Sequence, residues 1–136
     1  MAIRLEISTA DGTVLEYLAD YVSVPTEMGE IGIMSGHVPL VAIVKEGLLR
    51  IRSGERRESI AIAGGLLLLQ NDALAVTVDE AVNVAKIDVE EAEKARKRAA
   101  EALEEAKKAK LDGDEIALLE AKIRYQTVKQ MAKKTP

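Results

Sequence analysis

The stretch ALAVTVDEAVNVAKIDVEEAEKARKRAAEALEEAKK, residues 73–108, decides the fold, because the spacing of its apolar residues changes partway along it. Its first part, residues 73–79, has the β-branched composition of a strand. From Ile87 to residue 112 there is no glycine or proline, and alanine, glutamate, lysine and arginine dominate. That composition is typical of a helix. The sequence therefore predicts a boundary after Lys86, between a β-rich part and a helical part.

The residues before this boundary form many short strand-like segments separated by turns. Ile3, Leu5 and Ile7 alternate with polar residues, which is the period of a half-buried strand. Similar segments follow as YVSVPT (21–26), VPLVAIV (38–44), GLLRIRS (47–53), ESIAIAGG (58–65), GLLLLQ (65–70) and ALAVTVD (73–79). Many short strands at close spacing favour an antiparallel sandwich or barrel.

The residues after the boundary predict two helices joined by a short loop. Asp88 is the expected N-cap of the first helix. The loop LDGDE (111–115) ends it at Gly113 and starts the second, with Asp114 as the expected N-cap and an end near Met131. Alanines three or four residues apart give the first helix one apolar face, at Ala92, Ala95, Ala99, Ala102 and Ala106.

The predicted fold class is α+β: an N-terminal antiparallel β-sandwich, residues 1–86, followed by a C-terminal αα-hairpin, residues 87–136. Alanine buries little apolar area, so we expect the two helices to pack closely but weakly. Two interpretations stay open at this point. The hairpin either caps the sandwich as a solvated appendage, or it is a hinged element that swings away and binds elsewhere.

Composition excludes several classes of function. Without cysteine, and with a single histidine, the chain offers neither a thiolate nor a multi-histidine metal site, and we expect no metal and no cofactor. The apolar runs are too short to span a bilayer and the N-terminus lacks a signal peptide, so we expect a soluble, intracellular protein without membrane insertion. The net charge is −4, and neither half is basic enough to favour nucleic acid.

The segment GEIGIMSGHVPL, residues 29–40, concentrates three glycines, a proline and the only histidine. A catalytic site would need a nucleophile and an orienting acid beside His37, but the neighbouring Ser35 and Glu30 do not form a nucleophile elbow, so we expect no catalytic residue. Glycines at this density indicate positive φ or close backbone approach. We therefore expect a rigid contact loop, in which His37 caps a turn or fills a polar niche.

This segment, together with the later Gly64-Gly65 pair and the Ala/Glu/Lys/Arg hairpin, closely resembles the epsilon subunit of bacterial F-type ATP synthases over essentially the whole chain. The family pattern is filled by Gly29, Glu30, Ile31, Gly32, Ile33, Gly36, His37, Pro39 and Leu40. The resemblance implies a non-catalytic rotor subunit of the central stalk. In this interpretation Gly29, Gly32, Gly36 and Pro39 shape the loop.

The resemblance also implies partners and a location. The sandwich would bind the gamma subunit and the c-ring of the membrane sector, with Glu30, Ser35 and His37 as the c-ring contacts. The hairpin would either fold onto the sandwich or extend into the alpha/beta catalytic head and restrain ATP hydrolysis. The protein would then be peripheral, on the cytoplasmic face of the bacterial inner membrane. The alternative is a free-standing interaction adaptor with a sandwich and a helical arm.

The second helix is basic, which suits contact with an acidic surface of the catalytic head. The cations expected to restrain hydrolysis are Lys122, Arg124, Lys129, Lys133 and Lys134. Some family members bind ATP through a motif at the start of the first helix, where Asp88 would be the corresponding residue here, and Arg124 would correspond to a basic residue on the second helix. Glu91 stands where that motif has arginine, and its carboxylate would repel phosphate, so we expect weak ATP binding or none.

Overall fold

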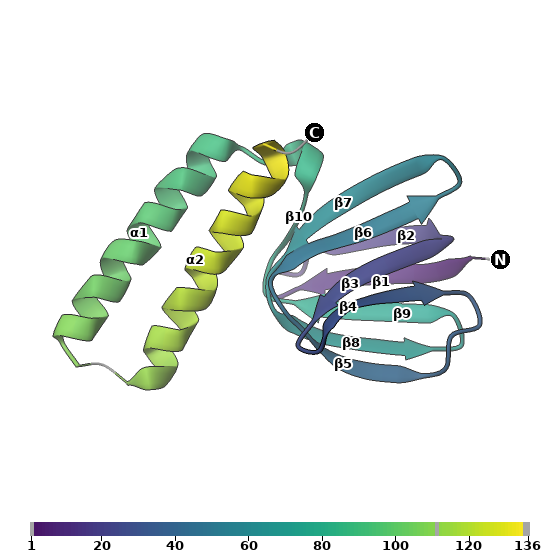
Figure 1. The fold of residues 1–136 in the computed structure, drawn as a ribbon, viewed down its shortest axis with the longest axis horizontal. Helices are drawn as coiled ribbons and strands as arrows, with labels where there is room; N and C mark the ends of the chain where they lie inside the picture. The colour runs from purple at the N-terminus through teal and green to yellow at the C-terminus, as the bar shows by residue number, and fades with distance from the viewer. Residues whose placement is uncertain (1, 111, 135–136) are drawn as a thin grey trace.

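The computed structural model describes residues 2–110 and 112–134, and they form a β-sandwich with two helices attached at one end (Figure 1). The strands are β1 (Ile3–Thr9), β2 (Val14–Ala19), β3 (Tyr21–Thr26), β4 (Gly29–Met34), β5 (Leu40–Val44), β6 (Gly47–Ser53), β7 (Arg56–Ile62), β8 (Gly65–Gln70), β9 (Ala73–Val78) and β10 (Ala81–Asn83). A 3-10 helix, η1 (Val84–Lys86), leads into α1 (Val89–Lys108) and α2 (Gly113–Lys134). The predicted fold class is confirmed.

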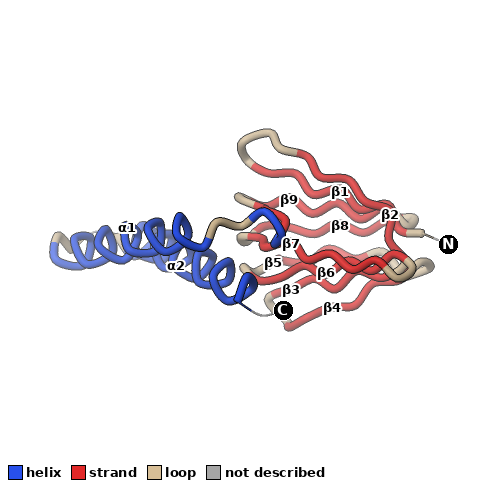
Figure 2. The backbone as a smooth tube through the Cα atoms, turned by 90° about the horizontal axis from the view of Figure 1, so that it is seen from above, coloured by secondary structure: helices blue, strands red, loops and turns tan. Residues whose placement is uncertain are grey.

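The strands run in the order β10-β7-β6-β3-β5-β8-β9-β1-β2, with β4 paired to the free side of β3. Between β3 and β5 only Thr26 and Val44 pair, so the sheet folds over at this point into two layers. Neighbouring strands are antiparallel except β1 and β9, which pair in parallel although they lie far apart in the sequence. Figure 2 shows the two helices side by side, projecting away from the strands.

The core lies between the two layers and consists of aliphatic side chains. Along β1, Ile3, Leu5 and Ile7 are buried while the intervening residues are exposed, as the period of two predicts. The other large side chains that are fully buried are Ile33, Leu49, Ile60, Ile62, Leu67, Leu69, Leu74, Val22 and Val24. No aromatic residue among the described ones is part of this buried set, although Tyr17 packs against it.

The segment predicted as a glycine-shaped loop is mostly a strand. Residues 29–34 form β4 and pair with the whole of β3, so the loop itself is confined to residues 35–39. Gly29 and Gly36 have φ values of 108° and 85°, which confirms the expected positive φ at these two positions. Gly32 serves close approach instead, because a Cβ there would lie 2.4 Å from the hydroxyl of Tyr21.

The helix boundaries match the prediction at one end of the hairpin and differ at its turn. The Asp88 carboxylate accepts the amides of Glu90 and Glu91, which confirms it as the N-cap of α1. The prediction of Asp114 as the N-cap of α2 is wrong, because the Asp112 carboxylate accepts a hydrogen bond from the amide of Asp114 at 3.1 Å. The loop thus ends two residues earlier than expected, and α2 continues to Lys134.

The alanine face of α1 is confirmed except at one position. Ala92 and Ala106 are buried and Ala95 and Ala99 are half-buried, but Ala102 is exposed. A helix turns by 100° per residue, so alanines at this spacing do not lie in one line, and Ala102 falls at the edge of the face. Leu103, the next residue, is half-buried in its place.

Candidate functional site

The loop of residues 35–39 is tied to the turn between β8 and β9. The hydroxyl of Ser35 donates to Asp72 Oδ2 at 2.7 Å, and the amide of Gly36 donates to Asp72 Oδ1 at 2.8 Å. These two hydrogen bonds, from Gly36 first and Ser35 second, lower the pKa of Asp72. One carboxylate therefore fixes two connections that lie far apart in the sequence.

His37 lies within this loop and is half-buried. Its amide donates to the carbonyl of Met34 at 3.2 Å, closing the turn, and its Nδ1 is 2.7 Å from the carbonyl oxygen of Val38. Its described contacts are with backbone, as expected for a histidine that shapes a turn. Gly36 and Pro39 flank it.

Glu30, the third residue of the predicted c-ring contact, lies at the opposite end of β4. It accepts a hydrogen bond from the Ser23 hydroxyl and pairs with Arg50 at 3.3 Å. Ser35 follows Glu30 by five positions, which corresponds to about 16 Å along a strand. The structure thus brings Ser35 and His37 together but not Glu30.

One outer face of the sandwich is apolar and carries no covering element in the described structure. Val41 pairs with Leu68, and Ile43 pairs with Leu66, across β5 and β8. The exposed fractions of these side chains are 70%, 50%, 52% and 57%, in that order. Four large apolar side chains packed side by side in water indicate a surface that binds another protein.

The hairpin is attached to the sandwich through a small second core centred on Tyr125. Its side chain, on α2, is 2% exposed and packs with Ala61 of β7 and with Ile87. The phenol donates a long hydrogen bond, 3.4 Å, to the carbonyl of Ala61. Burial, and secondarily the charge of Glu80, raises the pKa of Tyr125.

Cations of α2 surround this second core. Arg124 pairs with Glu46 in the turn between β5 and β6, and Lys133 donates to the carbonyls of Val84 and Ala85 at 3.4 Å and 3.1 Å. Lys129 lies 5.3 Å from the centre of the Tyr125 ring. Of the five cations predicted to be inhibitory, Arg124 and Lys133 therefore contribute to the docked arrangement, whereas the contact of Lys129 lies within α2.

The other two predicted cations are placed differently. Lys122 is exposed on α2. The side chain of Lys134 lies outside the described part of the chain, so the structure bears on it only through the helical backbone.

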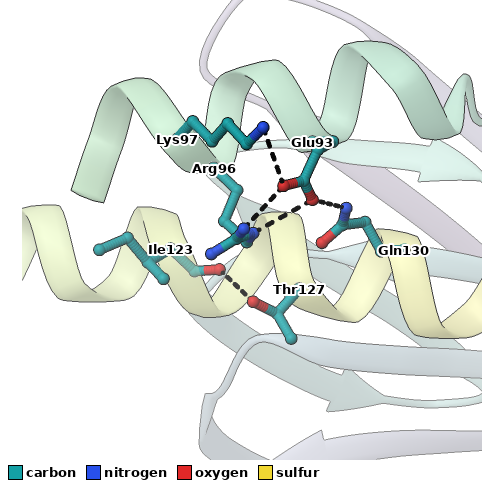
Figure 3. Close-up of polar contacts among 6 residues, drawn as sticks. All are labelled: Glu93, Arg96, Lys97, Ile123, Thr127 and Gln130. Carbon is teal, nitrogen blue, oxygen red and sulfur yellow. Dashed lines mark hydrogen bonds and ion pairs between the residues drawn. The ribbon is translucent and has the colours of Figure 1, made fainter. Parts of the chain in front are cut away.

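A polar clasp joins α1 to α2 near the sandwich (Figure 3). Glu93 of α1 accepts hydrogen bonds from Arg96, at 2.7 Å and 3.3 Å, and from Gln130 of α2. Lys97 adds an ion pair at 3.9 Å. The hydrogen bond from Arg96, and then that from Gln130, lowers the pKa of Glu93 to about 2. The seam between the helices therefore contains a polar contact, from Gln130 to the Glu93 carboxylate, in addition to the alanines.

The residues considered for nucleotide binding do not converge. The carboxylate of Asp88 is used by the helix cap, and Arg124 is paired with Glu46. Glu91 pairs with Arg98 at 3.2 Å. Within the described residues there is also no group of three or more acidic or histidine side chains that could hold a metal ion.

Three contributors to these sites were missed from the sequence. Tyr125 had a signal, because Ala121, Val128 and Ala132 recur around it at helical spacing and together mark a second apolar face of α2. Asp72 had a weaker one, as a carboxylate in a two-residue turn. Glu46 had none, since a charged residue in a turn is ordinary.

Comparison with known proteins agrees with this architecture. Residues 2–84 match the family described as ATP synthase, Delta/Epsilon chain, beta-sandwich domain. The ATP synthase epsilon chain of Bordetella avium is 34% identical, with 96% of this chain and 90% of the relative covered. The epsilon chain of Halalkalibacterium halodurans is 36% identical, over 81% and 83% of the two chains.

A solved structure supports the fold at lower identity. A chain in the cryo-EM structure of Euglena gracilis mitochondrial ATP synthase, OSCP/F1/c-ring in rotational state 1, superposes with a TM-score of 0.73 at 20% identity, covering 96% of this chain and 81% of that one.

The architecture is a β-sandwich with a loop tied at its far end, an exposed apolar face and a docked helical hairpin, and it presents several separate surfaces to other proteins. Given the identity to the relatives and its coverage, the chain belongs to the delta/epsilon family of ATP synthase subunits. This confirms the resemblance to epsilon subunits inferred from the sequence.

Proposed function

We propose that this chain is a non-catalytic rotor subunit in the central stalk of an F-type ATP synthase, coupling the catalytic head to the c-ring and restraining ATP hydrolysis. The full-length similarity to ATP synthase epsilon chains supports this role. In this proposal residues 1–86 bind the gamma subunit and the c-ring, and residues 87–136 regulate. The subunit lies peripherally at the cytoplasmic face of the membrane. No helix of the described residues is long and apolar enough to cross a bilayer.

The observation that carries the proposal is the exposed apolar face of β5 and β8. Val41, Ile43, Leu66 and Leu68 are held by a rigid sheet, so binding another protein there costs little conformational entropy. We assign this face to the gamma subunit. The loop of residues 35–39, with Ser35 and His37, is the proposed c-ring contact, while Glu30 belongs to a separate surface.

The docked hairpin supports the regulatory part of the proposal. Arg124 and Lys133 are engaged with the sandwich in this arrangement, and the same cations face the catalytic head when the hairpin extends. Docking and inhibition then compete for one set of side chains. The chain restrains hydrolysis only when those contacts with the sandwich have been released.

Introducing charge into the apolar face tests the gamma assignment. The double substitution Leu66→Asp/Leu68→Asp places two carboxylates in the contact and should weaken gamma binding at least a hundredfold, by titration calorimetry. Leu118→Asp changes an equally exposed leucine on α2 and is the matched control, which should bind gamma as the unmodified chain does. Unchanged binding by the double variant would remove the assignment. If even the unmodified chain failed to bind gamma, the free-standing adaptor would be the better interpretation.

A further inference from the structure

The second outer face of the sandwich, opposite in character to the apolar one, is rich in arginine. Arg50 and Arg52 point outward from β6, and Arg56 and Arg57 begin β7. Arg52 lies directly opposite Arg57 in the register. Like charges paired across strands destabilise a sheet, so this arrangement does not serve the stability of the sandwich.

Three of these arginines, Arg50, Arg56 and Arg57, line an open groove between the sandwich and the C-terminal end of α2, with a volume of about 1040 Å³. Four cations line it, Arg50, Arg56, Arg57 and Lys86, against two carboxylates, Glu30 and Glu58, which leaves a local charge of +2. The whole chain has a net charge of −4, so the groove reverses the sign of its surroundings. Leu48 and Val128 form an apolar part of the wall.

One side of the groove is an open strand edge. β10 pairs with β7 only through Ile60, Ala61 and Ile62, and the chain then turns away into η1. Residues 56–59 of β7 therefore have no partner strand on that edge among the described residues. In Figure 1, β7 extends beyond β10 along the outside of the sandwich. Unpaired amides and carbonyls of this kind are a template for an added strand.

The arginines at this open edge determine which kind of segment can pair with it. Arginines at an open edge repel a second copy of the same edge, which protects the protein from self-association. The same arginines attract a segment of opposite charge. Alternate residues of an extended segment lie about 6.7 Å apart on one face, a spacing that matches alternate residues of β6 that line the groove, such as Leu48 and Arg50.

We propose that the groove binds an extended acidic segment of a partner protein, which pairs with the open edge of residues 56–59 as an additional strand. Its carboxylates contact Arg56, Arg57 and Lys86, and an apolar side chain packs against Leu48 and Val128. Main-chain hydrogen bonds supply the affinity and the charges supply the selectivity. This site is separate from the apolar face proposed for gamma, and does not depend on that assignment.

The position of the groove gives such binding a consequence for the hairpin. Its wall includes Val128 and Ala132 of α2 as well as β7. A bound segment would contact both bodies at once and hold α2 against the sandwich. Occupancy of the groove therefore favours the docked hairpin.

The probe is a fluorescein-labelled octapeptide of alternating glutamate and valine, added to the full-length chain up to about 1 mM and followed by fluorescence anisotropy. It should bind, and should slow amide hydrogen exchange at residues 56–59. Two control peptides separate the contributions: alternating lysine and valine reverses the charge, and alternating glutamate and proline keeps the charge but removes half of the backbone donors. Both should bind at least tenfold more weakly.

Variants locate the site. Arg56→Glu/Arg57→Glu should weaken binding of the glutamate-valine peptide at least tenfold, while Arg4→Glu, an exposed arginine of β1 in the other layer, should change it less than twofold. If the double variant failed to fold, the peptide controls on the unmodified chain would still decide. No binding of the glutamate-valine peptide, or equal binding of the proline peptide, would overturn the proposal. The proposal would also be overturned if anionic vesicles or inorganic polyphosphate displaced the glutamate-valine peptide and the peptide did not slow amide hydrogen exchange at residues 56–59.

Discussion

Single carboxylates hold together segments that are distant in the sequence. Asp72 ties the turn between β8 and β9 to the loop of residues 35–39, and Glu93 ties α1 to α2. Asp88 does the same locally, as a helix cap. Asp72 and Glu93 each accept hydrogen bonds from more than one residue, which is the arrangement that lowers their carboxyl pKa.

Glu93 makes the hairpin clasp sensitive to acid. Its pKa is lowered from 4.5 to about 2, chiefly by the hydrogen bond from Arg96. A lowered pKa in the folded state means that the clasp stabilises the hairpin fully above pH 4.5 and loses this effect as the pH falls toward 2. The carboxyl signal of Glu93 in carbon-13 NMR should therefore titrate with a midpoint of about 2.

Substitution at this position supplies the control. Glu93→Gln should reduce amide protection around Gln130 at neutral pH, whereas Glu101→Gln, at an exposed position on the same helix, should leave it unchanged. A Glu93 midpoint near the ordinary value of 4.5 would show that the clasp does not form in solution.

At this scale the sequence predicts residues constrained by their own backbone and misses those defined by distant partners. Gly29 and Gly36 were identifiable because positive φ leaves few alternatives to glycine. Asp72 was not, because its donors lie 36 and 37 residues away and nothing local marks the pairing.

Among the elements, α2 has the least uniform environment. One side packs on α1 through the clasp, another packs on β7 through Tyr125, and Leu118 and Met131 are exposed. Tyr125 is the principal buried side chain of the docked contact. The ion pair of Arg124 with Glu46 adds less, because half of the arginine is in water.

Tyr125→Ala should release the hairpin without unfolding the sandwich. Removing a buried aromatic ring costs about 3 kcal/mol, which shifts the docking equilibrium more than a hundredfold. The chain has no cysteine, so spin labels on Thr13→Cys and Lys108→Cys report the distance between sandwich and hairpin without interference. The distance distribution should be narrow in the parent and broad in Tyr125→Ala.

The control for this prediction is Leu118→Ala, which truncates an exposed side chain of the same helix and should keep the narrow distribution. A narrow distribution in Tyr125→Ala as well would show that the second core does not hold the hairpin.

The accuracy of element prediction follows the strength of the pattern. Strands with strict alternation or long apolar runs, such as β1 and β8, were identified, whereas β2, β4 and β10 were not. β4 contains Gly29 and Gly32, which suggest a loop until Tyr21 is seen to fill the space above Gly32. The parallel pairing of β1 with β9 is a long-range contact that no local pattern encodes.

For the whole molecule, the structure separates three surfaces: the apolar face of β5 and β8, the loop tied by Asp72, and the groove lined by Arg56 and Arg57. The hairpin is joined to the sandwich by η1 and by the small core around Tyr125. The sandwich core is complete without the helices, because none of its fully buried members comes from α1 or α2. That residues 1–86 fold as a domain of their own stays a prediction.

The most direct test of the account is the rate of ATP hydrolysis by a reconstituted catalytic head with its gamma subunit, measured with the full chain and with a chain ending at Lys86. We expect the shortened chain to keep a β-type circular dichroism spectrum and full gamma binding, because its core is intact. We expect the full chain to lower the rate of ATP hydrolysis. With the shortened chain, the rate should approach that of the head and gamma subunit alone. Equal hydrolysis rates with the two chains, at saturating gamma binding, would contradict the regulatory role of the hairpin.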